Sequence, residues 1–163
     1  MARPSTPGRR SSCIALNGEA RLGVQMAVFR GESMLKLLFT LSAAYLAVVG
    51  LALMAFPREF GVGAVPPDAS SEMIALLRLL GGPFVGIAVL NWLSRNGGPS
   101  PERRAILLAN LVGFGAVAIN DIWGVASGEA REIAKLFVIV HLLLAAAFAA
   151  AAGSRRSRPE RVK

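Results

Sequence analysis

Apolar residues along the chain gather into four long blocks separated by short polar stretches. A helix that crosses a membrane needs about 20 mainly apolar residues, because each residue rises ~1.5 Å and the hydrocarbon layer is ~30 Å thick. The four blocks lie at about residues 34–56, 73–93, 105–126 and 134–152. They are continuous runs without the alternation of membrane strands. The pattern predicts an all-α integral membrane four-helix bundle with antiparallel helices in up-down order.

Polar stretches rich in Pro, Gly, Ser and charge connect the predicted spans, and such stretches are typical of loops. We expect residues 1–33 to form a disordered basic tail, because they are rich in Pro, Ser and Arg and contain no clear apolar segment. Residues 34–152 would form the transmembrane domain, and residues 153–163 a basic cytoplasmic tail. An alternative hypothesis is that translation starts at Met26 or Met34, where the membrane pattern begins.

Positive charge is strongly asymmetric about the predicted spans. Thirteen of the 18 Lys and Arg residues lie in the two tails and in the loop between the second and third spans, whereas the other two loops contain only Arg58 and Arg131. Because cytoplasmic loops carry an excess of Lys and Arg, both termini are predicted to be cytoplasmic in a multi-pass protein of the cell inner (plasma) membrane. The 15 Arg against 3 Lys, with abundant Ala and Gly, favour a bacterial source.

The same distribution explains the formal net charge of +8. Cations next to the spans attract anionic lipid headgroups, so the lipid bilayer is the expected partner. The basic C-terminal segment has no interleaved aromatic residues and no accompanying nucleic-acid-binding motif. No nucleic acid partner is predicted.

Ionisable residues inside the spans are the candidate functional groups, because a charge at bilayer depth costs at least ~2.5 kcal/mol. Arg78, Asp121 and His141 come from three different spans and lie at one level, about 8–10 Å below the outer boundary. We predict an ion pair between Arg78 and Asp121. His141 and the neighbouring Asn120 would complete its hydrogen bonds. Two interpretations besides a ligand or proton site stay open: a pair that only orients the helices, and an Arg78 that reaches outward while Asp121 meets water separately.

Small residues follow Arg78 along the second span. Gly82 and Gly86 match the small-xxx-small pattern of close helix packing, so the stripe that they form with Arg78 is expected to face inward. Gly81 and Pro83 predict a kink, because proline has no N–H to donate to the carbonyl four residues earlier. The kink is either a packing feature or the opening of a cavity beneath Arg78 for a small anionic or amphipathic ligand.

The residue types present restrict the chemistry that the chain can perform. One cysteine, Cys13, allows no internal disulfide and no cysteine metal cluster, and one histidine allows no histidine metal site within a single chain. The sequence contains no G-x-S-x-G, H-E-x-x-H or C-x-x-C motif and no P-loop. No catalytic residue, metal site or cofactor is therefore predicted.

The first span ends in Phe56-Pro57, and the second opens with Arg78-Leu79-Leu80-Gly81-Gly82. This arrangement resembles the small four-helix bacterial membrane proteins of the DoxX-like grouping, over about residues 34–152. The resemblance implies a fold and little chemistry, since that grouping is functionally mixed. The external loop contains no cysteine and no set of metal ligands, which disfavours a redox role.

The sequence thus favours a non-enzymatic accessory protein, or one that binds a small amphipathic ligand near Arg78, Asp121 and His141. One alternative is a subunit of an oligomeric proton or small-solute transporter. Another is a membrane redox subunit that takes its cofactor from a partner. The expected protein partner is a second copy of the chain or another membrane protein, with the Ala-rich fourth span as the docking face.

Overall fold

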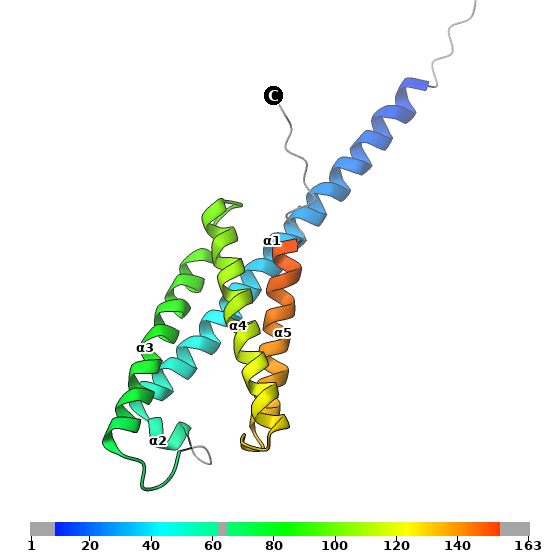
Figure 1. Ribbon diagram of the computed structural model, residues 1–163. Coiled ribbons are helices and arrows are strands. Elements are labelled where there is room, and N and C mark those ends of the chain that lie inside the picture. Colours follow the sequence, from blue (N-terminus) through cyan, green and yellow to red (C-terminus); the bar gives the residue numbers. More distant parts are fainter. Residues whose placement is uncertain (1–8, 62–64, 154–163) are drawn as a thin grey trace, which may run out of the picture. The chain divides into compact units, whose positions relative to one another are not determined.

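The computed structural model describes residues 9–61 and 65–153 (Figure 1). The elements in these ranges are α1 (Arg9–Ala55), α2 (Pro57–Phe60), α3 (Ser71–Ser94), α4 (Pro101–Ala126) and α5 (Ala134–Gly153). The chain divides into two compact units, with the boundary after Leu35. The described part of the first unit is the N-terminal part of α1. The second unit contains residues 36–55 of α1 and all the other helices.

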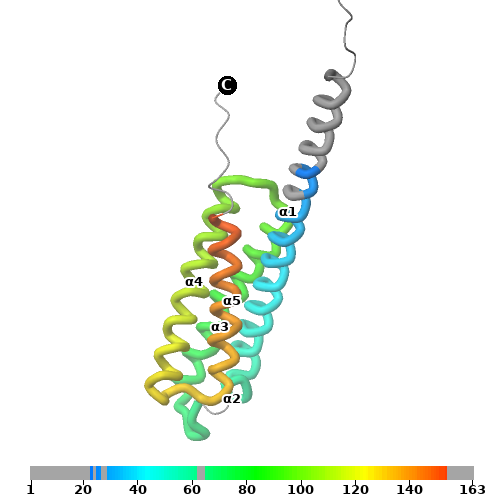
Figure 2. Tube along the Cα trace, turned by 90° about the vertical axis from the view of Figure 1, so that its right-hand side faces the viewer, coloured from blue at the N-terminus to red at the C-terminus, as the bar shows by residue number. Residues whose placement is uncertain are grey.

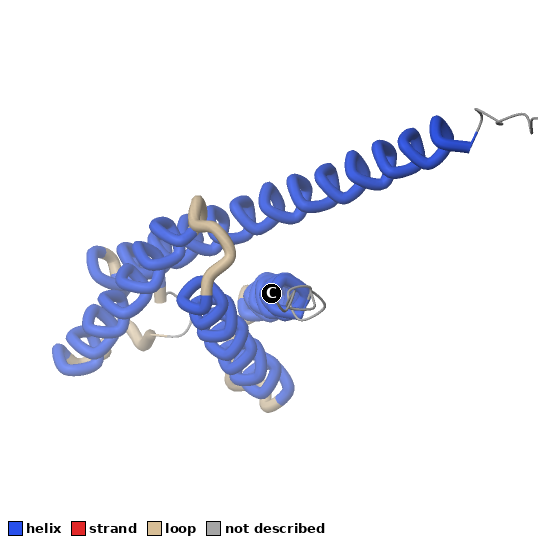
Figure 3. The backbone as a smooth tube through the Cα atoms, turned by 90° about the horizontal axis from the view of Figure 1, so that it is seen from above, coloured by secondary structure: helices blue, strands red, loops and turns tan. Residues whose placement is uncertain are grey.

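Within the second unit, residues 36–55 of α1 lie beside α3, α4 and α5, and successive long helices run in opposite directions (Figure 2). Figure 3 shows only helices and loops in the described residues. The predicted fold class, an all-α four-helix bundle, is confirmed. Helices α1 and α3 approach each other closely at two glycines, and α4 packs along α5.

Capping side chains set where two of the helices begin. The Ser70 Oγ accepts a hydrogen bond from the Met73 backbone N–H at 3.3 Å, and the Ser100 Oγ accepts one from the Arg103 N–H at 3.2 Å. Such caps satisfy N–H groups that have no partner within the helix. At the other end of α4, Gly128 has a φ of 75°, a left-handed conformation that reverses the chain toward α5.

Four helices are long and apolar enough to cross a membrane, at Phe29–Ala55, Ser71–Ser94, Pro101–Ala126 and Ala134–Gly153. They overlap the four predicted spans. Large apolar side chains such as Leu41, Leu79 and Leu143 are exposed on the outside of these helices, as lipid-facing residues would be. The chain is therefore a multi-pass membrane protein.

The predicted disordered tail is wrong for residues 9–33, which form the beginning of α1. No proline follows Pro7 until Pro57, so nothing in this segment breaks the helical hydrogen bonding. The segment also contains Ala, Leu, Arg and Glu, which are good helix formers. Residues 1–8 of that tail, and residues 154–163 at the C-terminus, lie outside the described residues.

Gly50 and Gly81 bring the backbones of α1 and α3 together. A Cβ added at Gly81 would lie 2.5 Å from the Gly50 carbonyl oxygen, and one at Gly50 would lie 2.8 Å from the Gly81 carbonyl oxygen. Gly82 and Gly86 are exposed, and a Cβ at either would meet nothing within 4 Å. The close approach in α3 therefore depends on Gly81 and not on the predicted glycine stripe.

The prediction that Arg78, Gly82 and Gly86 face inward is wrong for a geometric reason. On an α-helix, each residue lies about 40° further around the axis than the residue four positions before it. The stripe from Arg78 to Gly86 therefore turns progressively away from the bundle. Ile74, Gly81 and Ala88 are buried, and their spacing of seven residues keeps them on one face. Pro83 is exposed, and α3 continues through it.

A reciprocal amide pair joins α3 to α4. The Asn91 Nδ2 donates to the Asn110 Oδ1 at 2.8 Å, and the Asn110 Nδ2 donates to the Asn91 Oδ1 at 2.7 Å. The Asn91 Nδ2 also donates to the Ser42 Oγ on α1 at 3.2 Å, and the Asn110 Nδ2 to the Ile106 carbonyl at 2.9 Å. All three polar side chains are buried. Because their amide groups are bonded, they connect three helices without leaving unsatisfied polar groups.

Replacing Asn91 with Ala should lower the free energy of unfolding by about 1–2 kcal/mol, since the buried amide of Asn110 then loses its partner. Asn96→Ala, at an exposed loop position, is the matched control. Denaturant unfolding in detergent micelles measures both, and a double-mutant cycle with Asn110→Ala isolates the pair. Additive effects in that cycle would contradict a direct interaction.

Gly81→Ala should be destabilising by about 1–3 kcal/mol, because the new methyl group meets the backbone of α1 and forces the helices apart. The adjacent Gly82→Ala should be neutral or stabilising, since alanine favours the helix and the methyl group meets no neighbour. Thermal unfolding of the two variants in the same detergent makes the comparison. Equal melting temperatures would argue against the close contact.

Candidate functional site

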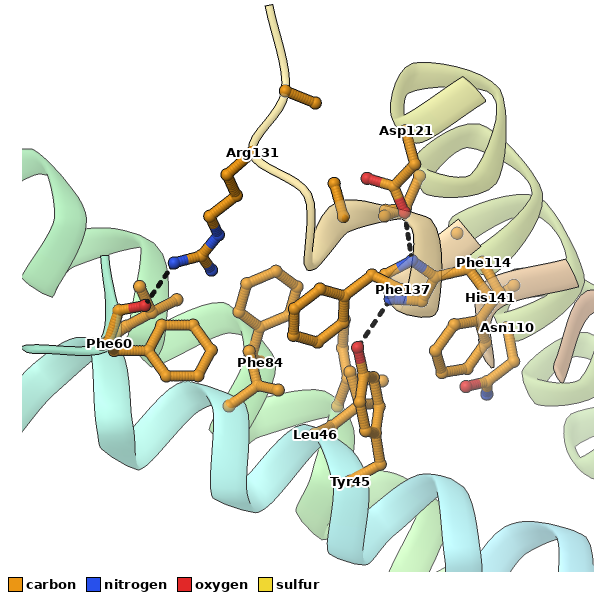
Figure 4. Close-up of a pocket in the computed structure, with 18 of the residues that line it drawn as sticks. Tyr45, Leu46, Phe60, Phe84, Asn110, Phe114, Asp121, Arg131, Phe137 and His141 are labelled. Carbon is orange, nitrogen blue, oxygen red and sulfur yellow. Dashed lines mark hydrogen bonds and ion pairs between the residues drawn. The ribbon is translucent and has the colours of Figure 1, made fainter. Parts of the chain in front are cut away.

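Three polar side chains from three helices form a continuous hydrogen-bonded chain. The Nδ1 of His141 on α5 lies 2.6 Å from the Oδ2 of Asp121 on α4. The other ring nitrogen, Nε2, lies 2.7 Å from the hydroxyl of Tyr45 on α1. Figure 4 shows the imidazole between the other two groups. His141 therefore connects α1 to both α4 and α5.

One arrangement of hydrogens satisfies the whole chain. A neutral His141 that carries its proton on Nδ1 donates to the Asp121 carboxylate, and its Nε2 accepts the hydrogen of the Tyr45 hydroxyl. A carboxylate next to Nδ1 favours this tautomer, because the negative oxygen stabilises the N–H. The three groups then act as one polar unit inside an apolar bundle.

Aromatic rings surround the imidazole. The ring centroids of Tyr45, Phe114 and Phe137 lie 5.6, 6.1 and 6.1 Å from that of His141. Phe114 also stacks on Phe148 at 5.8 Å, and Phe148 meets Phe39 edge-to-face at 5.9 Å. This packing links α1, α4 and α5 and fixes the orientation of His141.

A cavity of about 460 Å³ lies beside this polar chain, between α1, α3, α4 and α5. Most of its lining is apolar, including Leu46 and Val49 from α1, Phe84 and Ile87 from α3, and Val117 from α4. Tyr45, His141 and Asp121 form part of its wall, and the Asp121 side chain retains 18% exposure. The cavity thus combines an apolar volume of ligand size with a few convergent polar groups, which is the usual composition of a small-molecule site.

Charged residues lie at the end of the cavity formed by α2 and the α4–α5 loop. Glu129 and Arg131, both from that loop, contribute to the lining. The Arg131 guanidinium donates to the Phe60 carbonyl of α2 at 3.1 Å, and Figure 4 shows this bond on the opposite side of the cavity from Asp121. The bond joins the loop to α2, and Glu129 is exposed.

The structure brings together only some of the predicted site residues. Asp121 and His141 are bonded to each other, but the predicted ion pair between Arg78 and Asp121 is not formed among the described residues. Arg78 is exposed on the outside of α3, and Asn120 is exposed on α4. Asp121 pairs with the imidazole because both point toward the bundle interior, whereas Arg78 lies on the rotated stripe described above.

The cavity also differs in position from the one expected beneath Arg78. Gly82, Pro83 and Gly86 do not contribute to its lining, and Phe84 and Ile87 do. Tyr45 and Arg131 were not predicted as site residues. The sequence carried a signal for Tyr45, the only tyrosine, whose hydroxyl needs a partner near mid-membrane. It carried no comparable signal for Arg131, which acts through a loop contact across 71 positions of the chain.

The described residues contain no group of three or more His, Cys, Asp or Glu side chains that could hold a metal ion. Comparison of the chain with protein-family models, with curated proteins and with solved structures finds no match.

Proposed function

We propose that this protein is a non-enzymatic membrane protein that binds a small amphipathic molecule in the cavity beside Tyr45, His141 and Asp121. One observation carries the proposal: a hydrogen-bonded polar chain forms part of the wall of an otherwise apolar cavity of about 460 Å³. The polar chain would orient the head of a ligand, and the apolar walls would receive its body.

We further propose that the protein lies in a bacterial inner membrane with both termini in the cytoplasm. The support is the concentration of Lys and Arg in the tails and in the loop between α3 and α4. In that orientation, the end of the cavity near Glu129 and Arg131 faces away from the cytoplasm. A ligand would then enter from the external side or from the outer half of the bilayer.

Filling part of the cavity should weaken binding of a neutral amphipathic probe such as 2-naphthaleneethanol. Gly113 lines the cavity, and a Cβ there would meet nothing within 4 Å, so Gly113→Leu can occupy part of the volume. Equilibrium dialysis of the full chain in detergent, against empty micelles, should show saturable binding that this substitution weakens at least about tenfold, a loss of about 1.4 kcal/mol.

Gly115→Leu is the matched control, because Gly115 has equal space around it but does not line the cavity. This variant should bind the probe like the unmodified protein. Unchanged binding by Gly113→Leu, or equal loss in both variants, would contradict the assignment of the cavity as the binding site.

A second candidate function is proton transfer, which the same hydrogen-bonded chain favours. A carboxylate, an imidazole and a phenol at separations of 2.6 and 2.7 Å resemble the relays of Asp and His found in pumps and transporters. This candidate predicts proton flux in liposomes that contain the full chain. The flux should fall at least tenfold in Asp121→Asn, because an amide does not exchange the proton. Flux that survives the substitution would count against a path through this carboxylate.

A further inference from the structure

We infer that the ligand of this cavity is a lipophilic organic cation, an ammonium group on an apolar body; the inference rests on the proposed binding function. The cavity lining carries the carboxylates of Asp121 and Glu129 but only one permanently positive group, Arg131. Apart from His141, the charged groups of the lining sum to one negative charge. A monovalent cation would neutralise it.

The hydrogen bonds of Arg131 and Asp121 indicate that the positive charge of the ligand would lie beside Asp121. The Arg131 guanidinium is hydrogen-bonded to the Phe60 carbonyl across the end of the cavity. Asp121 accepts its hydrogen bond through Oδ2, and its Oδ1 has no hydrogen-bond partner among the described residues. A carboxylate oxygen beside apolar walls is unfavourable unless a donor or a positive charge meets it. An ammonium head group that carries an N–H supplies both a donor and a positive charge. A quaternary ammonium group supplies the positive charge alone.

Aromatic rings reinforce this preference. Each of the five helices contributes one ring to the cavity lining: Tyr45, Phe60, Phe84, Phe114 and Phe137. The faces of aromatic rings carry partial negative charge, and aromatic cages are a common way to recognise quaternary ammonium groups. An anionic head group would be repelled both by these faces and by the two carboxylates. The combination of carboxylate and rings therefore selects a cation.

Three probes of nearly the same size separate charge from shape. Benzyltrimethylammonium is the cation, neopentylbenzene is its neutral isostere with carbon in place of nitrogen, and 3-phenylpropanoate is the anion. Equilibrium dialysis of the full chain in a nonionic detergent, against empty micelles, measures the binding of each. We expect the cation to bind about tenfold more tightly than the neutral isostere and the anion to bind more weakly than both.

Asp121→Asn should remove most of the preference for the cation and leave binding of the neutral isostere within about twofold. Asp68→Asn makes the same chemical change at an exposed position outside the cavity and should change neither. Phe84→Leu removes one ring from α3, away from the His141 chain, and should weaken cation binding about threefold while sparing the isostere. If Asp121→Asn does not fold, as judged by gel filtration and circular dichroism, Phe84→Leu decides the question.

The outcomes distinguish the two proposals. Equal binding of all three probes, or tighter binding of the anion, overturns the inference of a cationic ligand and leaves the binding function standing. Saturable binding of none of the probes overturns the binding function itself. Cation binding that neither Asp121→Asn nor Phe84→Leu weakens places the cation outside this cavity and also overturns the inference.

Discussion

The hydrogen bonds of a single imidazole join three helices at the wall of the cavity in this bundle. His141 binds Asp121 with one ring nitrogen and Tyr45 with the other, at 2.6 and 2.7 Å. In the hydrocarbon core of a membrane, water is not present to replace a missing partner, so Asp121 and Tyr45 both depend on His141 for this hydrogen bond. The position of α1 relative to α4 and α5 therefore depends on the hydrogen bonds of these ionisable groups. Any change in their protonation or in their partners acts on the packing of three helices.

The cavity follows from where the other helix contacts lie. Gly50 and Gly81 allow the backbones of α1 and α3 to approach closely, and the amide pair of Asn91 and Asn110 joins α3 to α4. Between the His141 chain and α3, large aromatic and aliphatic side chains line the space without filling it. The bundle is thus held by specific polar and small-residue contacts around a volume that side chains leave unfilled.

The surroundings of Asp121 are unusual for a carboxylate that serves only to orient helices. A pair that served only to orient helices would be enclosed by packing, as Asn91 is; its partner Asn110 is 5% exposed and also lines the cavity. Asp121 instead keeps part of its surface on the cavity, and aromatic rings from every helix face the same space. Packing stability alone does not account for a carboxylate in this position. A neutral residue would cost less free energy to bury against apolar side chains than a carboxylate does. This difference supports a role in binding.

The sequence by itself determined the fold class and the four membrane-spanning helices, and it predicted that Asp121 and His141 lie close together, because length, hydropathy and rise per residue can be read along each helix separately. It did not determine which polar groups pair. Arg78 faces outward, because it begins a stripe of positions four residues apart that turns by about 40° per step away from the buried face of α3. The helical start of the chain was also missed, because polar composition alone suggested disorder. Only the tertiary structure decided that Tyr45 completes the chain, that Gly81 rather than Gly82 contacts α1, and that Arg131 reaches α2. Those contacts depend on the rotation and spacing of separate helices, which no local pattern encodes.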